Sequence, residues 1–375
     1  MNNFIQKSRH ILYRLKTQLF YESRFAVWMN RRIWMEPADG KVTEIYHEAQ
    51  DILPYFKFDE LEDVLARVKL RNFTERYAKE PNVIYEASGD FIVEPEFGLA
   101  IQRGRHLIRQ SGTLSHPSLK PGLVKYLIHY YFVRKYTFYP TLILCDGFAG
   151  QNLCHFIYDT INPILFMHQK RMLTDDIPIL VSEKIFQKPF FQYLLKNTVM
   201  GALPWKQQGR NEWIKTKRFQ KPFVSMEIFK STYKILEGPK RPYRKIFLNR
   251  KSNFQRNIKN IGAITEILKK YEFELIFAEE LSYENQVKLF REVKWFVGIH
   301  GAGLTNLLHA EIPDLRVLEI FSESLVHASF YRFLKILNVQ YYDAIVGDAF
   351  DINWNYAVDE SNFESKIIKL LGDQG

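Results

Sequence analysis

The chain has 375 residues, of which 46% are hydrophobic and 25% are charged, and it carries a formal net charge of +10. This length suggests two domains, and this balance is that of a globular protein rather than a disordered or fibrous one. The only cysteines, Cys145 and Cys154, exclude a disulfide scaffold and a cysteine-rich zinc site, and they favour a reducing compartment such as the cytoplasm.

Residues 1–35 carry seven basic side chains and one acidic side chain, so this segment supplies +6 of the net charge. Apolar residues recur between these charges near the helical period, which predicts a basic amphipathic helix within an N-terminal segment of residues 1–40. Two placements are open: the helix lies on the anionic inner face of the plasma membrane, or it packs its apolar side on the protein. The sequence predicts neither a secretory signal nor a membrane-spanning helix. Nucleic acid is not an expected partner, because the basic residues form no aromatic-interleaved binding module.

The first half of the chain reads as loop, then short strands, then an alternation of strands and helices. Residues 36–60 are predicted to be loop, because prolines and a glycine interrupt them. A β-rich patch is expected within residues 82–110, and strand–helix alternation follows it. The alternating elements are a strand at 141–145, a helix at 151–168, a strand at 179–181 and a helix at 188–197.

The second half repeats this alternation after basic, proline-containing stretches at 215–222 and 238–242, which we interpret as the passage between the halves. Its elements are strands at 245–248, 273–277, 296–299 and 317–321, and helices at 261–271, 283–293, 305–310 and 360–371. These patterns predict an α/β fold with two Rossmann-like, doubly wound domains that face a cleft, residues 41–225 and 226–375.

The most informative motif is a glycine turn that follows an apolar run at 296–299. His300 ends this run and is followed by Gly301-Ala302-Gly303, after which Thr305-Asn306 opens a helical pattern. Such a turn points main-chain N–H groups and the positive end of a helix at its ligand, and phosphate suits this arrangement. The third glycine of the dinucleotide fingerprint is missing, so an ordinary tight connection is the alternative.

Two further features support a phosphate site, and each also has an explanation that involves no ligand. Glu319 ends the next apolar strand, 18 positions after Gly301, where an acidic side chain can bind ribose hydroxyls; the alternative is a solvated strand end. Arg250 follows the strand at 245–248, and Arg256 lies just beyond it. Guanidinium groups at a strand end suit a diphosphate, although such clusters are often simply solvated. No acidic or histidine spacing predicts a metal site.

In the first half, Asn152, His155 and Asp159 fall on one face of the helix predicted at 151–168. His155 and Asp159 are four positions apart and can hydrogen-bond, which would make the imidazole a stronger base. The alternative is a helix whose apolar residues face inward while these polar groups are merely exposed.

Together these residues resemble glycosyltransferase family 61. The family hallmark Val-Gly-x-His-Gly-Ala-Gly-Leu-Thr-Asn is present at 297–306, and its Asn-x-x-His-x-x-x-Asp helix is similar to 152–159. The family's Ser-Arg after a strand, later Arg and Asn-Glu are matched by Asn249-Arg250, Arg256 and Asn260-Ile261. The resemblance spans roughly residues 80–325, with two departures: Asn249 stands in place of Ser, and Ile261 in place of Glu.

The resemblance implies a GT-B fold and an inverting transfer of a sugar from a nucleotide diphosphate sugar, without a metal ion or cofactor. The acceptor, a glycan or lipid-linked glycan, would approach from residues 41–225, where Asn152 lies and where His155 or Asp159 is the base. Residues 226–375 would bind the donor through Arg250, Arg256, Asn260, His300, Gly301, Ala302, Gly303, Asn306 and Glu319.

Bacterial relatives are linked with capsule, lipopolysaccharide or exopolysaccharide synthesis. Two other functions stay open on the sequence alone. One is a nicotinamide-dependent oxidoreductase that uses the same glycine turn, and the other is a non-catalytic glycan-assembly subunit with the same fold.

Overall fold

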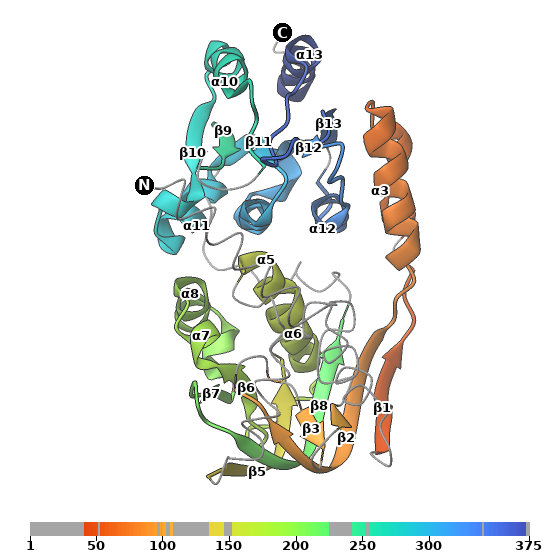
Figure 1. Ribbon diagram of the computed structural model, residues 1–375, viewed down its shortest axis with the longest axis vertical. Helices are drawn as coiled ribbons and strands as arrows, with labels where there is room; N and C mark the ends of the chain where they lie inside the picture. The colour runs from red at the N-terminus through yellow and green to blue at the C-terminus, as the bar shows by residue number, and fades with distance from the viewer. Residues whose placement is uncertain are drawn as a thin grey trace.

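The computed structural model describes residues 41–51, 53–95, 98, 100–102, 106–107, 135–145, 152–224, 242–251, 256–339 and 341–372. The helix predicted within residues 1–40 lies outside these ranges. The described residues contain two β-sheets, which occupy the lower and upper halves of Figure 1. The chain is therefore a mixed α/β protein, as its alternating pattern predicts.

The N-terminal sheet has eight strands, with seven of them in the order β4-β3-β2-β8-β5-β6-β7 and β1 paired with β2. Its strands are β1 (Lys41–Glu48), β2 (Asn82–Val93), β3 (Ala100–Gln102), β4 (His106–Leu107), β5 (Thr137–Leu144), β6 (Ile179–Ser182), β7 (Trp205–Gln208) and β8 (Ile214–Phe223).

This sheet corrects three expectations. It is mixed rather than doubly wound, because β8, β5, β6 and β7 run parallel while β1 to β4 and β8 pair antiparallel. The β-rich patch is part of the same sheet, since β2 continues through a bulge near Gly89 and pairs with β8. Strand β1 occupies part of the predicted loop at 36–60.

Residues 215–222 form the central strand β8 instead of a connecting passage. Their basic side chains hid the strand, because Lys215 and Lys217 are exposed while the intervening Thr216 is buried. This alternation is the period of a strand with one solvated face.

The C-terminal sheet has five parallel strands in the order β10-β9-β11-β12-β13. They are β9 (Arg244–Asn249), β10 (Glu274–Phe277), β11 (Val293–Ile299), β12 (Arg316–Ser322) and β13 (Tyr341–Gly347). In chain order this is 2-1-3-4-5, so the winding reverses between β9 and β11. In open α/β sheets, ligands bind outside the carboxyl ends of the strands at this reversal.

The helices and single turns account for most of the remaining described chain. In the first half they are η2 (Leu53–Tyr55), η3 (Phe58–Glu60), α3 (Val64–Tyr77), α5 (Leu153–His155), the π-helical η6 (Phe156–Ile161), α6 (Asn162–Gln169), α7 (Glu183–Phe186), α8 (Pro189–Asn197) and η7 (Val199–Ala202). In the second half they are α10 (Ile261–Lys270), η9 (Ala278–Glu280), α11 (Tyr283–Arg291), η10 (Ala302–His309), η11 (Ile312–Asp314), α12 (Ser329–Ile336) and α13 (Glu360–Leu371).

Alternate residues of the C-terminal strands build two cores, one on each face of the sheet. Phe247, Val297 and Leu318 pack under α10 and α13. Their neighbours Phe296 and Val317 pack on the opposite face with α11, η10 and α12. This second face is the one that lies toward the N-terminal sheet in Figure 1.

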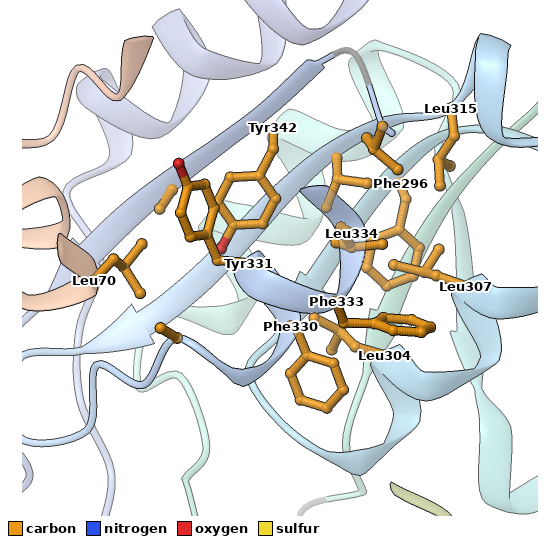
Figure 2. Packing of buried hydrophobic residues seen from close by; sticks show 14 of the residues in the cluster. Leu70, Phe296, Leu304, Leu307, Leu315, Phe330, Tyr331, Phe333, Leu334 and Tyr342 are labelled. Carbon is orange, nitrogen blue, oxygen red and sulfur yellow. The ribbon is translucent and has the colours of Figure 1, made fainter. Parts of the chain in front are cut away.

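Helix α3 crosses from its own sheet to this second face. Its chain neighbours β1 and β2 belong to the N-terminal sheet, yet Leu70 of α3 is fully buried in the core of the C-terminal sheet. Figure 2 shows Leu70 directed from α3 toward Tyr331 and Tyr342. Asp63 fixes the approach, since its Oδ1 accepts from the Ala66 amide and its Oδ2 from the Val346 amide of β13.

Candidate functional site

The glycine turn lies at the winding reversal of the C-terminal sheet. Arg250 directly follows β9, and His300 directly follows β11, so both stand at the carboxyl edge of neighbouring strands. A pocket opens there and is lined by Leu248, Asn249, Arg250, Ala278, Glu279, Ile299, Gly301, Ala302 and Gly303. Five of the residues that the sequence singles out as donor-binding are therefore in or next to one pocket: Arg250, His300, Gly301, Ala302 and Gly303.

Two side chains pack closely on the glycines of this turn. A Cβ atom on Gly301 would lie 2.9 Å from Arg250 Nη1, and one on Gly303 would lie 2.8 Å from Leu248 Cδ2. The segment that follows is the 3-10 helix η10, which begins at Ala302, earlier than the helix predicted at 305–310. The first N–H groups of a helix lack acceptors within it, so this turn presents main-chain donors to the pocket. Phosphate is the natural partner for such a group of amides.

Arg250 and Arg256 supply positive charge at the same edge. Burial lowers the pKa of both guanidinium groups, and the charge of Arg250 lowers that of Arg256 further. Arg256 Nη1 donates to the His300 carbonyl at 3.4 Å, which places this side chain beside the turn. Two like charges repel one another strongly in a half-buried setting, and a bound dianion would relieve that repulsion.

His300 is fixed by a buried carboxylate. Its Nδ1 lies 2.6 Å from Glu319 Oε1, and the Tyr342 hydroxyl donates to Glu319 Oε2 at 2.5 Å. Glu319 sits in the middle of β12 and is 0% exposed, so it is neither a solvated strand end nor within reach of a ribose. The expectation of ribose binding is corrected accordingly: both carboxylate oxygens are used inside the protein.

Asn260 and Asn306 also make their contacts within the protein. Asn260 Nδ2 donates to the Val358 carbonyl at 2.8 Å, and its Oδ1 accepts from the Val358 amide. Asn306 is 1% exposed and donates to Gln286 Oε1 at 2.9 Å. Gln286 in turn donates to the Ala278 and Leu281 carbonyls, so Asn306 ties η10 to the start of α11. The Asn260 side chain and the Asn306 amide group are thus used within the protein, whereas the buried Asn306 Oδ1 has no hydrogen-bond partner among the described residues.

The helix predicted at 151–168 forms, but it contains a π-helical turn. Asn152 caps it by accepting from the Cys154 amide at 2.9 Å. The turn has a local cause: Pro163 has no N–H to give to the Asp159 carbonyl, and the Asn162 amide bonds instead to Ile157, five residues back. π-turns of this kind occur frequently at functional sites.

His155 and Asp159 form the expected pair, with His155 directly before the π-helical segment and Asp159 within it. His155 Nδ1 lies 3.1 Å from Asp159 Oδ2, and both side chains are partly exposed. The hydrogen bond to Asp159 raises the pKa of His155, against the smaller opposing effect of burial. The imidazole is therefore a stronger base than an isolated histidine, and it remains open to solvent.

The helix that carries this pair lies against the glycine turn. Cys154 and Tyr158 pack on the core of the C-terminal sheet, and the Tyr158 and Phe333 rings are 5.8 Å apart. Helix α5 also contacts η10 directly, and Figure 1 shows α5 between the two sheets. His155 and Gly301, 146 positions apart in the chain, are thus brought to one junction.

A further histidine at this junction is His327, which lies between β12 and α12. Its ring centroid is 6.1 Å from that of His300 and 4.0 Å from that of Phe73 of α3. No motif or spacing marks it, because its neighbours Phe73 and His300 come from two distant segments. Tyr342, the partner of Glu319, is likewise recognisable only in three dimensions.

Within the part of the chain that the structure describes, no three histidine, cysteine, aspartate or glutamate side chains are grouped as metal ligands. None of the described helices is both long and apolar enough to cross a membrane.

Comparison with known families gives a match to glycosyltransferase 61 over residues 153–313. This range begins at α5 and includes His155, Asp159, both arginines and the glycine turn. A comparison with curated proteins gives no match.

Proposed function

Because the chain belongs to glycosyltransferase family 61 and is a glycosyltransferase, we propose that it moves a sugar from a nucleotide diphosphate sugar to a hydroxyl group of a glycan acceptor. The transfer proceeds with inversion and without a metal ion. One observation carries this proposal: two half-buried guanidinium groups flank a glycine turn at the winding reversal of a parallel sheet, next to a His–Asp pair on a helix from the other half of the chain.

The donor diphosphate lies against the amides of Gly301, Ala302 and Gly303, and Arg250 and Arg256 neutralise its charge. The negative charge that develops on the leaving diphosphate strengthens these interactions as the reaction proceeds, and such preorganised stabilisation is a large source of catalysis. His300 directly precedes the turn and is held by Glu319, which acts as a positioning residue instead of the ribose ligand expected from the sequence.

The acceptor hydroxyl is activated by the pair on α5 and η6. The acceptor oxygen forms a bond to the anomeric carbon, the bond from that carbon to the diphosphate oxygen breaks, and the hydroxyl proton passes to His155. Asp159 supports the resulting imidazolium. Asp159 as the proton acceptor itself is the close alternative, since both groups are partly exposed. Displacement from the face opposite the leaving group inverts the anomeric centre.

Further parts of the proposal rest on the family resemblance. The arrangement is of the GT-B type, with residues 41–225 on the acceptor side, Asn152 among them, and residues 226–375 on the donor side. The protein acts in the cytoplasm at the inner face of the plasma membrane, in the synthesis of a bacterial surface polysaccharide on a glycan or lipid-linked glycan. The basic segment at 1–35 supplies the peripheral membrane contact.

The donor site is tested by ligand-dependent thermal unfolding. We expect UDP or GDP to raise the Tm of the protein, whereas NAD does not. Gly301→Ala is expected to abolish the shift, because the new methyl group displaces Arg250. Gly262→Ala in α10 is the matched control, since a Cβ there meets nothing within 4 Å. Stabilisation by NAD alone would favour an oxidoreductase instead.

The reaction is tested by release of nucleotide from a nucleotide sugar in the presence and absence of a chelator. We expect turnover that the chelator leaves unchanged, and its loss in His155→Ala or Asp159→Ala with donor binding retained. Turnover that vanishes with chelator contradicts the metal-independent mechanism. A complete lack of hydrolysis and transfer favours a non-catalytic assembly subunit.

A further inference from the structure

His327 is a histidine at the junction that the proposed function does not use. It lies in the connection from β12 to α12, is partly exposed, and packs against Phe73 of α3 and near His300. The ring is therefore held between its own connection, α3 and the residue that directly precedes the glycine turn. A polar ring positioned by so many elements can contact a ligand with a defined geometry.

The contacts of His327 define its tautomer. The Ser329 hydroxyl contacts His327 Nδ1, and the Ser329 amide donates to the same nitrogen at 3.3 Å. Because an amide N–H can only donate, Nδ1 is the acceptor and the proton of the neutral ring lies on Nε2. Burial and the charges of His300, Arg332 and His155 lower the pKa of His327 to about 4, so the ring is neutral at pH 7. Nε2 makes no hydrogen bond within the described residues. His327 thus offers one N–H donor without a protein partner among them.

His300 presents a second ring nitrogen. Its Nδ1 is taken by Glu319, which leaves Nε2 on the opposite side of the ring. The two ring centroids are 6.1 Å apart, and one oxygen with hydrogen bonds of about 2.8 Å to both rings fits such a separation. A hydroxyl group suits either protonation state of His300, because its oxygen accepts up to two hydrogen bonds and its proton can be donated.

The position of the two histidines relative to the proposed diphosphate site indicates which part of the donor carries this hydroxyl group. His300 directly precedes Gly301, where the diphosphate binds in the proposed function, and α5, the helical turn that contains His155, contacts η10. The sugar must lie between the leaving diphosphate and the base, because its anomeric carbon reacts with both. We propose that His327, together with His300, binds a hydroxyl group of the transferred sugar and so determines which sugars the enzyme accepts. This inference rests on the proposed function.

The test compares the binding of nucleotides with that of nucleotide sugars by titration calorimetry, using UDP, UDP-glucose, UDP-galactose, UDP-xylose, GDP and GDP-mannose. His327→Phe keeps a ring over Phe73 but has no N–H group. We expect it to bind UDP or GDP like the wild type and to bind the corresponding nucleotide sugar about ten-fold more weakly, as the loss of one hydrogen bond implies. His327→Gln, which keeps an N–H donor, should lose less. His47→Phe on the exposed edge of β1 is the control and should change neither.

Equal weakening of the nucleotide and its sugar would place His327 on the phosphate and overturn the inference, as would unchanged binding of both. If His327→Phe does not fold, His327→Asn decides the question, since its loss for the nucleotide sugar must exceed its loss for the nucleotide. A wild-type protein that binds none of the six compounds overturns the proposed function as well, and this result differs from variants that bind all of them alike.

Discussion

At the scale of single residues, Glu319 shows how a buried charge can serve a site without touching its ligand. It is fully buried, and its two oxygens hold His300 and the Tyr342 hydroxyl. A carboxylate accepts hydrogen bonds at both oxygens, whereas a carboxamide turns one of them into a donor.

Glu319→Gln should therefore lower both stability and donor binding. The amide group would face either the His300 N–H or the Tyr342 hydroxyl, and an unsatisfied buried group costs about 1–3 kcal/mol. Thermal unfolding and UDP titration measure the two effects. Tyr342→Phe is the comparison, because it removes a bond at the other oxygen and should affect stability more than UDP binding. A Gln variant with the Tm and affinity of the wild type would remove Glu319 from this role.

His155 leads to a prediction about pH. The base must be neutral to accept a proton, and Asp159 raises the pKa of His155. We expect kcat/KM to fall as the pH decreases through this raised value, which lies above the ordinary histidine pKa of about 6.5. In Asp159→Asn the carboxylate is lost, the pKa of His155 falls, and the acidic limb of the profile should move to lower pH with a reduced maximum. A limb that does not move contradicts His155 as the base.

At the scale of elements, the π-turn at Phe156–Ile161 sets the spacing of His155 and Asp159, the pair that we propose to be catalytic. Pro163→Ala restores the missing N–H group and allows a regular helix. We expect the variant to remain folded, with a Tm at or above that of the wild type, while the transfer rate falls about 10–100-fold because the pair is displaced. Pro189→Ala in the first turn of α8 is the control, since proline is ordinary there. A variant with full activity would show that the turn is incidental.

The elements also show what the sequence can and cannot predict. The helix at 151–168 and the strands of the C-terminal sheet are confirmed, because buried parallel strands are continuous apolar runs and their helices have a clear apolar period. The prediction of a connecting passage at 215–222 was wrong, because these residues form β8. The exposed lysines and Pro222 of this strand are typical of a connection. The π-turn was not predicted, because a proline after polar residues also fits an ordinary kink.

The candidate site also contains residues that the sequence predicts and contacts that it does not. The turn at Gly301–Gly303, Arg250 and the His155–Asp159 pair follow from local spacing, and the structure brings them together. The contacts of Glu319 and Asn260 depend on Tyr342 and Val358, which are distant in the sequence. Local pattern therefore identifies groups that face a pocket better than it distinguishes them from groups that hold the pocket in shape.

At the scale of the whole molecule, α3 links the two sheets into one unit. Leu70 is 0% exposed within the core of the C-terminal sheet, and Lys69 of the same helix donates to the Glu323 carbonyl at 2.6 Å. The chain thus joins the two sheets through α3 as well as through the connection from β8 to β9.

Leu70→Ala should lower the free energy of unfolding by about 2–5 kcal/mol, the usual cost of a cavity at a buried leucine. Because α3 belongs to both halves, calorimetry should show one cooperative transition that moves as a whole to lower temperature. Val68→Ala on the exposed side of the same helix is the matched control and should have little effect. Two separate transitions in the Leu70 variant would mean that the halves unfold independently.

Because α3 crosses between the sheets, a hybrid of this protein and a relative cannot be made with a single crossover point between the two halves of the chain. Residues 53–78 contribute Phe56, Phe58 and Leu70 to the packing of the C-terminal sheet, although they precede most of the N-terminal one. An exchange of everything after residue 225 would leave Tyr331 and Tyr342 beneath a helix of foreign sequence. A working hybrid must inherit two separate stretches of chain from the same parent.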